Sequence, residues 1–129
     1  MYEETTQNIK ITVKPYYLDS QSDPAEDRYI WAYHVVIENL GEESVKLINR
    51  YWRIIDEAGH IEEVHGAGVV GEQPSLKPGD VFEYASGTPL KTPSGIMGGH
   101  YEMKSDKGLF NAIVPSFSLD SPFSKSKMN

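Results

Sequence analysis

Apolar and polar residues alternate one by one through most of this chain, and this period of two constrains the fold more than any other feature. In segment 8–15, Ile9, Ile11 and Val13 fall on one side and the polar residues between them fall on the other. Successive side chains of a strand point to opposite faces, so this segment is predicted to be a strand with one face buried. No segment shows a sustained 3.6-residue apolar period, so we expect an all-β protein.

Turn signals separate the segments that carry this strand pattern. In the long segment 44–56 the apolar residues change face around Asn49 and Arg50, which predicts a β-bulge. The acidic segment 19–27 is predicted to be a hairpin loop, and 86–95 a long connection. Short strands at this regular spacing predict a β-sandwich of about seven or more antiparallel strands. The other strands are expected at 8–15, 28–39, 61–64, 80–85, 97–104 and 109–114.

The length of 129 residues indicates a single domain spanning 1–129. We expect its core over about 8–119, because 1–7 and 121–129 are polar and are expected to be flexible. The N-terminus has neither the basic nor the apolar region of a secretory signal. No apolar run approaches the ~20 residues of a membrane helix, so we expect a cytoplasmic protein without a membrane partner.

Charge and cysteine content exclude further classes of function. A net charge of -7 argues against nucleic acid as a partner bound through bulk charge. The chain has no cysteine, which excludes disulfides, thiolate zinc sites and a cysteine nucleophile. There is no Gly-x-Ser-x-Gly elbow. We therefore expect a protein that is not an enzyme and that uses no cofactor.

Three glycines, Gly66, Gly68 and Gly71, lie within six residues, and we call residues 66–71 the glycine segment. Their spacing matches the dinucleotide-binding fingerprint, which needs a helix directly after it. Pro74 and the Pro78–Gly79 turn leave no room for that helix. We therefore interpret the glycines as residues that allow a positive φ or a close backbone approach.

Several blocks of the sequence together resemble the ApaG family, also called CorD. They span nearly the whole chain: 64–74 around the glycines, Arg50–Ile54, Leu76–Tyr84, Gly95–Tyr101 and Val114–Leu119. The resemblance implies an immunoglobulin-like or fibronectin type III-like β-sandwich. It implies an accessory domain for protein–protein interaction, since the domain recurs in eukaryotic F-box proteins and in a polymerase delta-interacting protein. The family is linked by phenotype to cobalt and magnesium resistance. Its bacterial gene often neighbours one for diadenosine tetraphosphate hydrolase. The glycine motif is the family's proposed ligand site.

The candidate binding residues follow from these patterns. Arg50 and Arg53 bracket Tyr51–Trp52, a combination that suits anion or protein recognition. The favoured interpretation is that Trp52 lies in the core and that the arginines form cross-strand ion pairs with Glu or Asp. Among the four histidines only His65 is a weak metal candidate, so we expect no metal site. We expect a binding module with a protein partner and leave weak homo-oligomerisation open. The alternative is small-anion or nucleotide binding at Gly66, Gly68 and Gly71 with Arg50 and Arg53.

Overall fold

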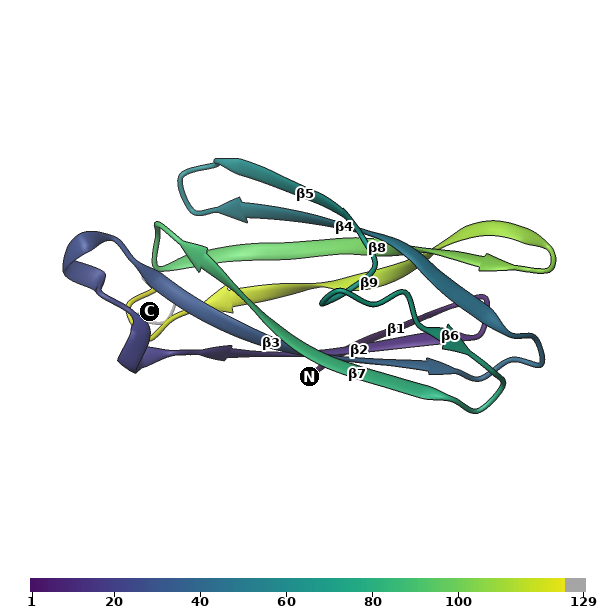
Figure 1. The fold of residues 1–129 in the computed structure, drawn as a ribbon. Coiled ribbons are helices and arrows are strands. Elements are labelled where there is room, and N and C mark those ends of the chain that lie inside the picture. Colours follow the sequence, from purple (N-terminus) through teal and green to yellow (C-terminus); the bar gives the residue numbers. More distant parts are fainter. Residues whose placement is uncertain (125–129) are drawn as a thin grey trace.

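The computed structural model describes residues 1–124, which form two antiparallel sheets packed face to face (Figure 1). The first sheet has the order β1 (Tyr2–Thr6), β2 (Ile9–Tyr17), β3 (Tyr29–Asn39), β7 (Val81–Leu90). The second has the order β5 (Ile61–Ala67), β4 (Val45–Asp56), β8 (Ser94–Ser105), β9 (Gly108–Asp120), and β6 (Ser75–Leu76) also pairs with β4. Two short 3-10 turns, η1 (Asp19–Gln21) and η2 (Pro24–Glu26), lie in the β2–β3 loop. The predicted all-β sandwich is confirmed.

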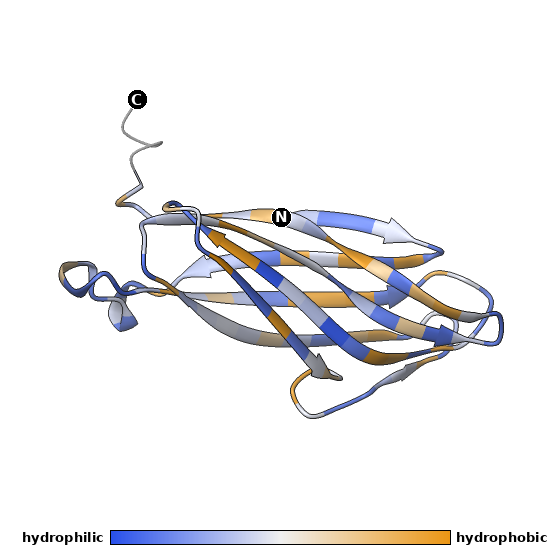
Figure 2. Ribbon diagram, turned by 90° about the horizontal axis from the view of Figure 1, so that it is seen from above, coloured by the Kyte–Doolittle hydropathy of each residue, from blue (hydrophilic) through white to orange (hydrophobic). Residues whose placement is uncertain are grey.

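The alternation in the sequence becomes the core of the sandwich. Hydrophobic and hydrophilic residues alternate along the strands, as Figure 2 shows. In β3 every odd-numbered residue from Tyr29 to Asn39 is buried, and β3 lies between β2 and β7 as a central strand. Trp52 of the second sheet packs against Tyr33 of the first, with ring centroids 5.3 Å apart, and against Phe117 at 6.2 Å. The Trp52–Tyr33 contact joins the two sheets, and the Trp52–Phe117 contact packs two strands of the second sheet together.

A bulge in β4 redirects its side chains, as the sequence predicts. Leu47 pairs with Met103 and Asn49 pairs with Glu102, so Ile48 is an extra residue in β4. Inward positions are therefore odd-numbered before the bulge and even-numbered after it, which places Trp52 in the core. Without this shift, Trp52 and Ile54 would point to the outer face of the second sheet.

Some predicted boundaries were wrong. Tyr2–Thr6, placed outside the core by the sequence, forms edge strand β1, which only two half-buried side chains mark. Residues 86–90, expected to belong to a long connection, continue β7, with Thr88 and Leu90 buried. Pro89 is tolerated there because β7 is an edge strand.

The C-terminal tail also differs from its sequence-based expectation. Ser121 and Ser124 are buried, so the expected flexibility of the tail does not fit its first residues. The same expectation for 125–129 lies outside the described residues. Within residues 1–124, no helix is long and apolar enough to cross a bilayer.

Candidate functional site: the glycine segment and the adjoining sheet face

The glycine segment is the end of β5 and the turn that follows it. Gly66 lies in β5 directly opposite Arg50 of β4. The amide of Gly68 then donates to the carbonyl of Ile48, the bulge residue, at 2.8 Å. The side chain of Gln73 donates to the same carbonyl at 2.9 Å. The carbonyl of this β4 bulge residue therefore accepts hydrogen bonds from within the segment and from a residue just after it.

Residues 69–72 form a tight two-residue turn. Val69 and Glu72 exchange backbone hydrogen bonds of 2.8 and 2.9 Å. The residues between them, Val70 and Gly71, have φ angles of +43° and +82°, as in a type I′ turn. Gly68 also has a positive φ, +64°, and a Cβ there would lie 2.1 Å from the carbonyl oxygen of Glu72. The glycines therefore satisfy needs of the backbone, and three amides of the segment and its flank donate to protein carbonyls.

Arg50 supports this segment from inside the sandwich. Its Nη1 donates to the carbonyl of Gly68 at 3.0 Å and to that of Ala67 at 3.3 Å. Next to it lie the buried hydroxyls of Tyr84 and Tyr101, which share a hydrogen bond. Burial raises the pKa of both tyrosines, and the nearby Arg50 charge opposes that shift.

Arg50 and Arg53 do not meet. They are three residues apart in one strand, so they point to opposite faces of the sheet. Arg50 lies on the inner face with Tyr101, its partner in β8, whereas Arg53 is exposed on the outer face opposite Glu63. The structure thus brings Arg50 together with Gly66 and Gly68 but leaves Arg53 on the other side.

Three rings line up on the outer face of the second sheet, in what we call the aromatic row: His65, Tyr51 and His100. These residues are direct cross-strand neighbours in β5, β4 and β8. The Tyr51 ring centroid lies 4.9 Å from that of His65 and 5.0 Å from that of His100. The Tyr51 hydroxyl donates to Oε2 of Glu63 at 2.7 Å, and this bond raises the pKa of Tyr51.

A groove of about 450 Å³ runs along the aromatic row. Its other wall is formed on the same face by Asn49 and Glu102, which we call the polar row, with Ala67 beside Asn49. Asn49 Nδ2 donates to Oε1 of Glu102 at 2.8 Å across the two strands. Arg50 and Gly66 also line the groove and lie between its walls in sequence, so their backbone forms the floor.

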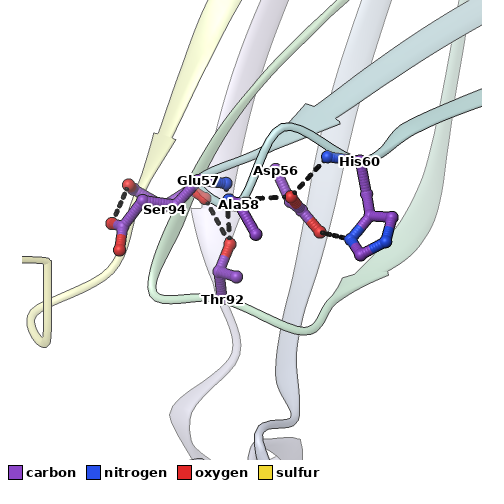
Figure 3. Close-up of polar contacts among 6 residues, drawn as sticks. All are labelled: Asp56, Glu57, Ala58, His60, Thr92 and Ser94. Atoms are coloured by element: carbon purple, nitrogen blue, oxygen red, sulfur yellow. Dashed lines mark hydrogen bonds and ion pairs between the residues drawn. The ribbon is translucent and has the colours of Figure 1, made fainter.

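A second polar cluster joins the β4–β5 turn to the β7–β8 loop (Figure 3). Asp56 accepts the amides of Ala58 and His60 at 2.9 and 3.0 Å. Ser94 Oγ donates to Oε1 of Glu57 at 2.6 Å. The imidazole of His60 points away from Ser94, so these groups do not form a nucleophile–base pair (Figure 3). The cluster fastens two loops together.

The remaining histidines lie apart from one another. His34 contacts Glu83 at 3.0 Å on the outer face of the first sheet, and His60 contacts Asp56 at 3.6 Å. Within residues 1–124, no three His, Asp or Glu side chains lie close enough to hold a metal ion. His65, the weak metal candidate, instead belongs to the aromatic row.

Sequence reasoning missed the aromatic row and its groove. The local part of the signal was available, because the turn at Ala58–Gly59 sets the register that places His65 opposite Tyr51. The other part was not, because His100 reaches Tyr51 through a long-range pairing of β8 with β4. Patterns within one strand do not specify which distant strand lies beside it.

Comparison with known proteins identifies the family. The family model of the ApaG domain matches residues 19–105. "Protein ApaG" of Agrobacterium fabrum is 60% identical over 123 residues, covering 95% of each chain. "Protein ApaG" of Paramagnetospirillum magneticum is 55% identical over 130 residues, covering 100% of each chain. The crystal structure of a "putative ApaA protein" from Bordetella pertussis matches with a TM-score of 0.85 and 42% identity, over 90% of this chain and 95% of that one. The chain therefore belongs to the ApaG family.

Proposed function

We propose that this protein is a non-enzymatic binding module that contacts a protein partner through the outer face of its second sheet. One observation carries the proposal: two rows of apolar and aromatic side chains lie uncovered there. The first is the aromatic row. The second, the isoleucine row, consists of the cross-strand neighbours Ile61, Ile55 and Ile96, of which Ile61 and Ile96 are each 53% exposed.

Such a surface suits protein recognition. Adjacent exposed apolar side chains on one face mark interaction sites, whereas singly scattered ones are ordinary. Between the two rows lies a charged row with Glu63, Arg53 and the side-chain-free Gly98. The face therefore alternates apolar and charged rows, as protein interfaces combine buried apolar anchors with polar contacts.

Affinity capture from a native lysate tests this proposal. The wild-type chain is compared with an Ile61→Glu/Ile96→Glu variant, called the isoleucine variant, which places two negative charges in the isoleucine row. The matched control, Thr12→Glu/Ala85→Glu, adds the same charge to the outer face of the first sheet. We expect the wild-type chain and the control variant to capture a stoichiometric partner and the isoleucine variant to fail to capture it. A partner retained by that variant, at unchanged protein stability, contradicts it.

Metal resistance enters the proposal only through the partner. The family's link to cobalt and magnesium is expected to act through whatever protein this face binds, because no metal-holding group of three lies within residues 1–124. A cytoplasmic location belongs to the same proposal. Cell fractionation with an antibody to the native protein tests it.

Small-anion or nucleotide binding at the glycine segment is the alternative proposal. The proximity of Arg50 to Gly68 favours it, but this arginine donates to carbonyl oxygens of the segment. The amides of Gly68, Val69 and Glu72 donate to protein carbonyls as well. Calorimetric titration with pyrophosphate and nucleotides tests the alternative, and heat that Arg50→Met abolishes would favour it over backbone geometry.

A further inference from the structure

The groove between the aromatic row and the polar row has a chemical character that points to one kind of ligand group. Its aromatic wall is preorganised, because Tyr51 is held between two imidazole rings at centroid distances of 4.9 and 5.0 Å. The hydroxyl of Tyr51 is also fixed by Glu63. A ligand that packs on this wall therefore binds with little further loss of side-chain conformational entropy.

Two carboxylates beside this wall form no ion pair among the described residues, although Arg53 lies across the strands from Glu63. Glu102 is held by the neutral amide of Asn49, and Glu63 by the neutral hydroxyl of Tyr51. Among the described residues, neither carboxylate lies within 4.0 Å of a lysine, arginine or histidine nitrogen. The hydrogen bonds orient the carboxylates without neutralising them. At Glu102 the bond engages Oε1, and no hydrogen bond to Oε2 occurs within residues 1–124.

An arginine side chain matches both features. Its guanidinium is planar and stacks on aromatic faces, and its paired N–H groups fit a carboxylate. A lysine ammonium carries the same charge, but it is not planar and does not present a pair of parallel N–H groups to a carboxylate. A phosphate-bearing ligand would meet the negative charge of Glu102 in a chain whose net charge is already -7.

We propose that this groove receives an arginine side chain of the partner protein, an inference that rests on the proposed function. The aliphatic part of the arginine packs along Tyr51 and His100. The guanidinium reaches the carboxylate of Glu102, with Oε2 as its acceptor. The isoleucine row then contacts apolar residues of the same partner.

Titration of the isotope-labelled full-length protein with short peptides, followed by NMR, tests the inference. Three matched peptides carry arginine, lysine or the uncharged isostere citrulline between glycines. We expect the arginine peptide to shift amides around Tyr51, His100 and Glu102, with lysine weaker and citrulline without effect. Glu102→Gln is expected to weaken arginine-peptide binding about fivefold, the worth of one exposed charge pair. Glu83→Gln, which removes a carboxylate from the first sheet's outer face, leaves binding unchanged.

The outcomes separate this inference from the proposed function. Equal binding of the citrulline peptide, shifts centred elsewhere, or no shifts overturn the arginine site. If the isoleucine variant still loses its partner in that case, the proposed function stands without it. Concentration-dependent shifts of the same amides in the absence of peptide would assign the groove to a second copy of this chain and overturn the partner assignment. If the isoleucine variant keeps every partner, the proposed function fails whatever the peptides do.

Discussion

The guanidinium of Arg50 occupies the space that a side chain at Gly66 would need. A Cβ at residue 66 would lie 2.5 Å from Nη1 of Arg50. The same nitrogen donates to the carbonyl of Gly68 at 3.0 Å. Gly66 is thus required by the arginine that supports the segment, so the role of this glycine lies in packing between β4 and β5.

Replacing Gly66 tests this dependence. Gly66→Ala is expected to displace the guanidinium from its two carbonyl acceptors and to lower the free energy of unfolding by about 1–2 kcal/mol. In an Arg50→Met background the same alanine is expected to cost less, because no guanidinium has to move. Urea denaturation of the four proteins measures the coupling. The same cost in both backgrounds contradicts the account.

The other two glycines are expected to differ strongly from each other. A Cβ at Gly68 meets the carbonyl oxygen of Glu72 at 2.1 Å, whereas one at Gly71 meets nothing within 4 Å. Gly68→Ala should therefore lower the free energy of unfolding by about 3 kcal/mol or more, since clash and strain combine. Gly71→Ala should cost about 1–2 kcal/mol, for the positive φ alone. Chemical denaturation that ranks the two variants equally would refute this reading.

Val70 offers a stabilising substitution. It is a β-branched residue at φ +43° in the turn, and its side chain is 57% exposed. Val70→Asn creates Asn-Gly, the preferred pair for a type I′ turn, and is expected to raise the free energy of unfolding by about 1 kcal/mol. The melting temperature should rise, while a Val70→Ala control should gain less. A fall in stability with asparagine would show that the turn has another conformation.

Alkaline pH should destabilise the fold through Tyr84 and Tyr101. Burial raises the pKa of both in the folded state above the ordinary value near 10. Their contribution is therefore complete below about pH 10 and is lost as the pH rises, because the unfolded chain then ionises first. Tyr84→Phe should make the decline of the unfolding free energy shallower by about 1.4 kcal/mol per pH unit above pH 10. Urea titrations from pH 8 to 11 check this, and parallel declines in the two proteins would contradict it.

Alternation within single segments was enough to predict the all-β fold and the bulge in β4. The change of apolar face near Asn49 revealed the bulge, because a one-residue insertion must reverse the alternation. β1 escaped notice because an edge strand buries too little to alternate. The extension of β7 escaped because glycine and proline in 86–90 read as a turn, although an edge strand tolerates both.

The candidate site was less predictable than the fold. Arg50 lies at the glycine segment as considered from the sequence, but the direction of its hydrogen bonds, towards carbonyls, depends on the turn geometry. Arg53 was separated from it by simple alternation. Predicting the groove would require the register between β4 and β8, because this pairing places His100 beside Tyr51, far away in the sequence. Such pairings are chosen by the packing of the whole sandwich.

Site-specific photo-crosslinking in living cells tests the central claim most directly. A photoreactive residue is placed at Ile96 or His100 on the second sheet's outer face, and at Lys14 or Val36 on the first sheet's outer face. The account predicts a discrete protein adduct from the first pair of positions and none from the second. Adducts from the first sheet alone, or none from either face in correctly folded protein, would contradict it.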